Sequence, residues 1–122
     1  MGKFTVTKEH IYIGYIRTLE SFTRALVRED DIAVGTQIFE DLDIYVRTYL
    51  CDENLKIYLD EGWIDHEIAE KSRALLSGFC ALGKECPGLW NAASVKTAEE
   101  WRKLMELSEE IRADLYYIPD ME

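Results

Sequence analysis

Carboxylates are the side chains of this sequence whose spacing comes closest to a catalytic pattern. Glu106 and Glu109 are three residues apart, so on a helix they would lie on neighbouring turns and could hold a divalent metal ion together. A helical metal site of this kind needs further carboxylates from a facing helix. No second pair follows at helical spacing, and the cluster Glu40, Asp41 and Asp43 lacks a partner one turn away. We therefore interpret these acids as parts of solvated helix faces.

The Glu106-x-x-Glu109 spacing resembles one half of the metal site of MazG-type nucleotide pyrophosphatases. These all-helical enzymes bind magnesium with a Glu-x-x-Glu pair and a later Glu-x-x-Asp pair, and the second pair has no counterpart here. Glu109 stands three residues before Arg112 and Glu99 four before Lys103, which is the geometry of surface ion pairs. A small helical metal-carboxylate enzyme is therefore an alternative interpretation and not the preferred one.

Other catalytic and binding signatures are missing from the sequence. His10 and His66 belong to no metal-binding spacing, and no glycine pattern of a phosphate-binding loop occurs. An activated serine needs a nearby base and an oxyanion-binding turn, but Ser77 falls inside a predicted helix. Nucleic-acid binding needs a basic face, which this acidic chain lacks. We expect no catalytic residue, no metal ligand, no cofactor and no nucleic-acid partner.

Negative charge is concentrated in one part of the chain. Residues 29–70 contain thirteen carboxylates against Arg47 and Lys56, a net charge of −11, whereas the remaining residues sum to +1. A surface of one sign attracts a partner of the opposite sign and raises its association rate. We therefore predict a basic protein partner, with Trp63 as an aromatic anchor among the acids. The predicted contact residues are Glu40, Asp41, Asp43, Asp60, Glu61, Trp63, Asp65 and Glu67.

Helices position these side chains. Apolar residues spaced three and four apart predict helices over about 7–27, 31–51, 52–61, 65–82 and 97–115. Thr7, Asp30 and Asp65 are suitable N-caps, and Gly62 and Gly83 would end the third and fourth helices. The predicted fold is all-α, a compact antiparallel bundle of about five helices that forms one domain over residues 1–122.

Local patterns refine this prediction. The second helix should bury a stripe that comprises Ile38, Leu42, Tyr45 and Tyr49, flanked by Phe39, Val46 and Leu50. Thr97 followed by Glu100 predicts a capping box at the start of the last helix. After the turn at Pro87, Trp90 should pack back onto the core. The end segments 4–6 and 116–118 either pair as a small ribbon or, as we prefer, pack irregularly on the bundle.

Targeting signals are not evident. No apolar run approaches the roughly 18 residues that span a membrane, and Met1–Thr7 lacks a secretory pattern, so we expect a cytoplasmic protein without membrane contact. An odd number of cysteines, three, favours reduced thiols, of which Cys86 beside Pro87 should be the most exposed. The oligomeric state stays open.

A small, acidic, single-domain helical protein without a catalytic motif resembles the immunity proteins that bacteria make against their own toxins, in contact-dependent inhibition and colicin-type systems. The resemblance is one of class and spans the whole chain loosely. It implies a stoichiometric inhibitor that binds a cognate toxin domain, often a nuclease with a basic cleft, and blocks access of the substrate. A helical adaptor or dimerisation module, with an apolar interface, is a further alternative.

Overall fold

Helices and the turns between them make up residues 7–119, the part of the chain that the computed structural model describes, and no β-strand occurs in this range. The prediction of an all-α fold is therefore confirmed. In chain order the elements are α1 (Lys8–Ser21), the 3₁₀-helix η1 (Arg24–Arg28), α2 (Asp31–Gly35), the π-helix η2 (Thr36–Leu42), α3 (Asp43–Tyr49), α4 (Asp52–Asp60), α5 (His66–Glu85), the 3₁₀-helix η3 (Pro87–Leu89), α6 (Ala92–Thr97) and α7 (Glu99–Asp114).

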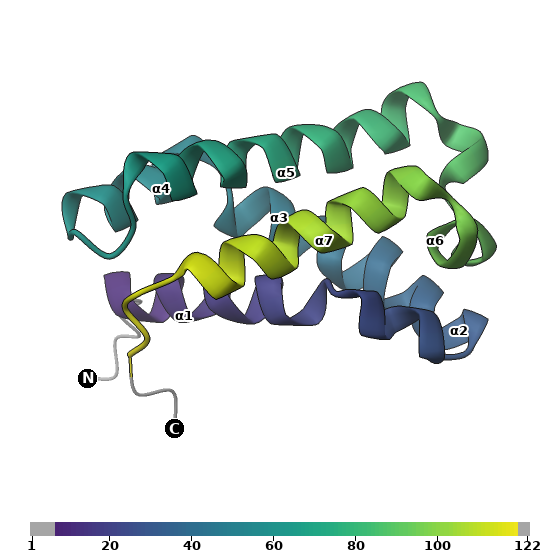
Figure 1. Ribbon diagram of the computed structural model, residues 1–122, viewed down its shortest axis with the longest axis horizontal. Helices are drawn as coiled ribbons and strands as arrows, with labels where there is room; N and C mark the ends of the chain where they lie inside the picture. The colour runs from purple at the N-terminus through teal and green to yellow at the C-terminus, as the bar shows by residue number, and fades with distance from the viewer. Residues whose placement is uncertain (1–6, 120–122) are drawn as a thin grey trace, which may run out of the picture.

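The three longest helices run along the long axis of the molecule (Figure 1). Helix α7 lies between α1 and α5 and is antiparallel to both, and α3 packs against α1. Helices α2 and α6 contact each other at one end, while the loop between α4 and α5 lies at the other. Compared with the five predicted helices, the structure adds α6 and the two 3₁₀-helices, and the second predicted helix is the continuous run α2–η2–α3.

Helix ends follow the predicted caps where the signal is local. The side chains of Thr7, Asp30 and Asp65 accept hydrogen bonds of 3.1, 2.7 and 2.9 Å from backbone N–H groups three residues later. Gly62 has φ +76°, the left-handed conformation that favours glycine, and ends α4 as predicted. The N–H of Trp63 bonds the carbonyl of Tyr58, and the N–H of Gly62 bonds that of Leu59, a Schellman motif.

Three predicted boundaries are wrong. The first helix ends at Ser21 instead of continuing to residue 27. Thr97 does not cap the last helix, because it is the last residue of α6 and its hydroxyl donates to the carbonyl of Ala93 at 2.8 Å. Gly83 does not end α5, which continues to Glu85; a Cβ there would lie 3.2 Å from Cζ3 of Trp90, so this glycine instead admits the indole ring.

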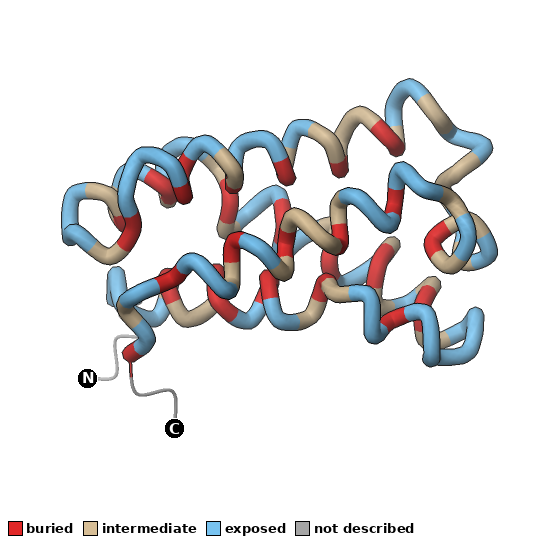
Figure 2. The backbone as a smooth tube through the Cα atoms, in the orientation of Figure 1, coloured by how far each residue is buried: buried red, intermediate tan, exposed pale blue. Residues whose placement is uncertain are grey.

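Aromatic rings fill the core at the end where α6 lies. Trp101 is fully buried, and its ring centroid lies 5.4–6.2 Å from those of Phe22, Phe79 and Trp90. The prediction that Trp90 packs back onto the core is thus confirmed. Figure 2 shows that buried positions lie on the sides of the helices that face one another.

A second aromatic cluster occupies the other end of the core. Tyr12 lies 5.2 Å from Tyr58 and 5.7 Å from Tyr117 between ring centroids. Residues 116–118 form no strand and pack irregularly on the bundle, as preferred from the sequence; residues 4–6 lie outside the described range. The buried hydroxyls of Tyr15 and Ser72 hydrogen-bond each other at 2.8 Å, which compensates their removal from water.

The buried stripe of the second helix differs from the predicted one. Tyr45 is 44% exposed and Tyr49 is half-buried, so neither belongs to the fully buried stripe. The buried residues are instead spaced strictly by four: Val34, Ile38, Leu42, Val46 and Leu50. In an α-helix each four-residue step rotates a side chain about 40° around the axis. The wider turn of η2 counteracts this drift and keeps the whole row on the core side.

Candidate functional site

The eight predicted contact residues lie in two groups near opposite ends of α5. Asp65 caps the start of α5, whereas Asp43 shares a shallow pocket with Gly83 and Lys84 near its last turn. Between His66 and Gly83 the helix extends roughly 26 Å, at about 1.5 Å per residue. The structure therefore does not bring the predicted contacts together on one surface.

In the group from Asp60 to Glu67, every acid has a partner within the chain. Asp65 accepts a backbone hydrogen bond as an N-cap, and the other three form ion pairs. These are Lys56–Asp60 at 2.7 Å, Lys8–Glu61 at 3.3 Å and Lys71–Glu67 at 3.6 Å. Asp60 and Glu61 are thus compensated by lysines, whereas Lys71 also pairs with Glu110 and Asp114 at 2.7 Å and compensates Glu67 only in part.

Trp63, the predicted aromatic anchor, packs onto the protein itself. Its ring centroid lies 5.0 Å from that of Tyr12 and 5.5 Å from that of Tyr117, with which it stacks. The side chain is half-buried and belongs to the aromatic cluster at this end. This position is typical of a packing residue.

Of the other group, Asp43 is half-buried, whereas Glu40 and Asp41 lie on an exposed side of the run α2–η2–α3. We call this side the outer face; it comprises Ile32, Thr36, Glu40, Asp41, Ile44 and Tyr45, which are all exposed. Ile32 is 83% exposed and Ile44 61%. Within residues 7–119, Glu40 and Asp41 form neither an ion pair nor a side-chain hydrogen bond, whereas Asp43 pairs with Arg47 at 3.0 Å. Sequence reasoning missed the two isoleucines.

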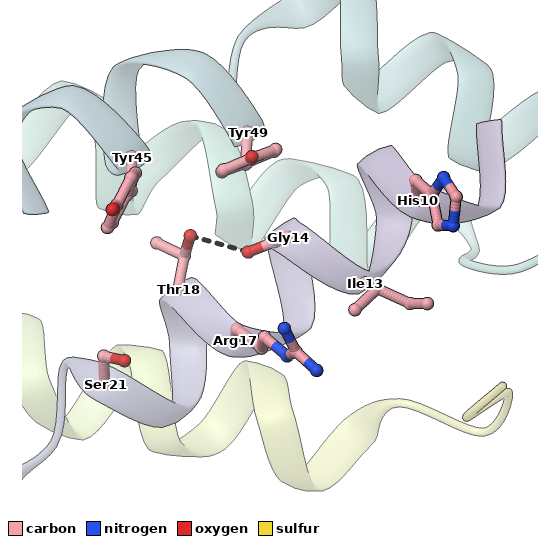
Figure 3. Close-up of a pocket in the computed structure, with 8 residues that line it drawn as sticks. All are labelled: His10, Ile13, Gly14, Arg17, Thr18, Ser21, Tyr45 and Tyr49. Carbon is pink, nitrogen blue, oxygen red and sulfur yellow. Dashed lines mark hydrogen bonds between the residues drawn. The ribbon is translucent and has the colours of Figure 1, made fainter. Parts of the chain in front are cut away.

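Beside the outer face, α1 and α3 enclose a groove of about 460 Å³ (Figure 3). It is lined by His10, Ile13, Gly14, Arg17, Thr18, Ser21, Tyr45 and Tyr49. The two tyrosine rings lie 6.2 Å apart between centroids. Helices α1 and α3 approach closely here because Gly14 has no side chain: a Cβ would lie 2.4 Å from Cε1 of Tyr49.

Cations from outside residues 29–70 compensate part of the acidic stretch. Besides Lys8 and Lys71, Arg73 pairs with Asp52 at 2.8 Å and Lys96 pairs with Asp31 at 2.8 Å. The surface field is therefore less one-sided than the distribution of charge along the sequence predicts. Glu40 and Asp41 on the outer face differ from these acids, because they have no ion-pair partner within residues 7–119.

Glu106 and Glu109, the pair considered as metal ligands, both take part in ion pairs. Arg24 bonds Glu106 at 3.3 Å and Glu109 at 2.8 Å, and it holds the pKa of Glu109 below its ordinary value. The predicted partners of Glu109 and Glu99 are wrong, since Glu99 pairs with Arg102. Residues 7–119 contain no group of three or more His, Cys, Asp or Glu side chains arranged to hold a metal ion.

The thiols of Cys51, Cys80 and Cys86 form no disulfide and are all half-buried. No helix within residues 7–119 has the length and apolar character needed to cross a bilayer.

Comparison with known proteins finds no matching family model, curated relative or solved structure. A function for this chain therefore has to be inferred from the surface features described above.

Proposed function

We propose that this chain is a stoichiometric inhibitor of the immunity-protein type, located in the cytoplasm, which binds a basic toxin domain through its outer face. One observation carries the proposal. On this face, Glu40 and Asp41 have no partner within residues 7–119, and they lie between Ile32 and Ile44, which are largely exposed to solvent. Unpaired charge beside uncovered apolar surface is the combination expected of a protein-binding site.

The two kinds of residue have different roles in such an interface. The carboxylates attract a basic partner over several ångströms and increase the association rate. The apolar side chains slow dissociation, because covering a large aliphatic side chain contributes about 2 kcal/mol. Ile32 and Ile44 stand roughly 18 Å apart along the helix, a separation that fits within a protein interface of standard size.

The second group of predicted contacts has a lesser part in this proposal. Asp60, Glu61 and Glu67 already pair with lysines of the chain, so a partner would have to compete with those contacts. Exposed ion pairs of this kind are individually weak, but they reduce the charge that a distant partner experiences. The acids of this end would affect association less than Glu40 and Asp41.

The test is co-expression with the protein encoded directly upstream of this gene, as the candidate toxin. The proposal predicts that the upstream protein arrests growth alone, that this chain restores growth, and that the purified pair associates in equal amounts. The variant Glu40→Lys/Asp41→Lys should slow association about tenfold or more at low salt. The matched control Glu53→Lys/Glu70→Lys makes the same change in net charge at exposed acids away from the outer face, and should change the rate far less.

Two results would contradict the proposal. The proposed inhibitory function is refuted if the upstream protein is harmless, or if this chain does not relieve its toxicity. Equal slowing by the two double variants would indicate that net charge alone governs association, and that the outer face is not the contact surface.

A further inference from the structure

The central row of the outer face runs straight along α2–η2–α3. Its members stand at intervals of four residues and are all exposed: Ile32, Thr36, Glu40 and Ile44. In a regular α-helix such a row rotates about 40° at each step, so its two ends would face different directions. The buried row from Val34 to Val46, offset by two residues, stays on the core side because of the wider turn of η2. The exposed row therefore also keeps one direction over its length.

A straight row suits a helix of the partner that lies along it. Two regular helices usually cross at an angle and touch over a short stretch, because the rows of side chains on their surfaces are inclined to the axis. Here the row stays parallel to the axis over roughly 18 Å, so a helix lying along it keeps contact over that whole length. An extended segment would lack backbone partners, since residues 7–119 contain no β-strand whose edge it could join.

The order of side chains along the row determines the chemistry of that helix. Ile32 and Ile44 form the two ends and are 83% and 61% exposed. Between them stands Glu40, with Asp41 beside it, and neither acid has an ion-pair partner within residues 7–119. Glu40 is two four-residue steps from Ile32 and one step from Ile44. A complementary helix presents an apolar residue at each end of its contact side and a lysine or arginine between them.

We propose that the outer face binds a single amphipathic helix of its partner, with a basic residue between two apolar ones on the contact side. The proposal rests on the proposed function, because it takes the outer face as the contact surface, and it adds the structural class of the partner element. The apolar residues of that helix cover Ile32 and Ile44, while its cation lies beside the carboxylates of Glu40 and Asp41.

Synthetic peptides of about 18 residues, long enough to form a helix, separate the contributions of charge, pattern and helicity. The basic peptide carries leucine, lysine and leucine on one side of an alanine- and glutamine-rich helix, with the lysine two turns from one leucine and one turn from the other. The acidic peptide has glutamate in place of the lysine, and the scrambled peptide keeps the composition of the basic one without the stripe. The broken peptide adds a central proline, which interrupts the helix.

Each peptide is titrated into the ¹⁵N-labelled full chain, and backbone amide shifts are followed by NMR. We expect saturable shifts in α2, η2 and α3, with the basic peptide binding about tenfold more tightly than the acidic one at low salt and the difference declining as salt is added. The scrambled and broken peptides should bind more weakly than the basic one by a similar factor.

Several results would overturn the proposal. Equal binding of the scrambled peptide would indicate attraction by net charge alone, and equal binding of the broken peptide would indicate an extended occupant. Shifts confined to other elements, or no saturable binding of the basic peptide, would also refute it. Shifts of the outer face on concentrating the chain alone would show that a second copy occupies it. A harmless upstream protein together with the expected peptide binding would refute only the inhibitory function.

Variants test which residues are responsible. Ile32→Ser and Ile44→Ser should each weaken binding of the basic peptide about fivefold, because each removes apolar surface that the helix would cover. Glu40→Gln/Asp41→Asn should abolish the preference for the basic over the acidic peptide. Ile118→Ser is the matched control, since Ile118 is 44% exposed but lies in the segment after α7, and it should change neither affinity. If Ile118→Ser weakens binding as much as Ile32→Ser does, the assigned surface is wrong.

Discussion

Gly14→Ala tests whether α1 and α3 pack as closely as the groove geometry requires. In a helix interior, alanine is favoured over glycine by about 1 kcal/mol, so this change would ordinarily stabilise the protein. Here the new Cβ would lie 2.4 Å from both Cε1 and Cζ of Tyr49. The Tyr49 carbonyl accepts the Tyr58 hydroxyl at 3.0 Å, which restrains the backbone of α3, so the ring has to absorb the strain.

The net effect should be a loss of stability. Overpacking costs about 1–3 kcal/mol, which exceeds the helix-propensity gain and leaves a loss of about 1 kcal/mol. For a domain of this size, that loss lowers the urea midpoint by about 0.5 M. Equilibrium urea unfolding followed by circular dichroism measures it directly.

Gly35→Ala is the matched control, because Gly35 is helical and a Cβ there meets no atom within 4 Å. It should raise the free energy of unfolding by about 0.5–1 kcal/mol. In a Tyr49→Ala background, Gly14→Ala should also become stabilising, because the clash is gone. If Gly14→Ala stabilises the wild-type chain as Gly35→Ala does, Tyr49 does not pack tightly on α1 and the described groove is incorrect.

Two further predictions concern the second aromatic cluster and the end of α4. Burial raises the phenol pKa of Tyr12, Tyr15 and Tyr58 above the ordinary 10.0, so their contribution to stability is complete below pH 10 and declines as pH rises beyond it. The urea midpoint should fall as pH rises above about 10, less steeply in Tyr15→Phe, and a constant midpoint would contradict this burial. Gly62→Ala should cost about 1–2 kcal/mol because of its positive φ, whereas Gly88→Ala should cost much less; equal urea midpoints would refute the assigned backbone conformation.

Helix starts were predictable where the capping residue is not part of a preceding helix. Asp30 and Asp65 satisfy an N–H three residues later, and this interaction depends on little beyond the local segment. The Thr97 prediction failed because α6 extends through that residue. Asn91 starts α6 by accepting the N–H of Ser94 at 2.8 Å, a cap visible in the sequence that our prediction did not use.

The candidate site was only partly predictable, because its charges are decided by tertiary contacts. Glu61 and Asp31 pair with Lys8 and Lys96, which lie far away along the chain. Glu40 and Asp41, which were predicted as contacts together with Glu61, have no such neighbour within residues 7–119. Charge counted along a sequence cannot distinguish paired acids from unpaired ones, because a cation distant in the sequence comes close to an acid only when the chain folds.

The exposed apolar residues, by contrast, follow from a pattern that the sequence does contain. Five apolar residues stand at intervals of four from Val34 to Leu50, whereas a regular α-helix has 3.6 residues per turn and would rotate the last of them well away from the first. Burying all five requires a wider turn, which η2 supplies. Once that row faces the core, the row offset from it by two residues must face solvent, and it includes Ile32, Glu40 and Ile44. The outer face is therefore a geometric consequence of the core register, and its apolar residues remain exposed because no other element of residues 7–119 covers them.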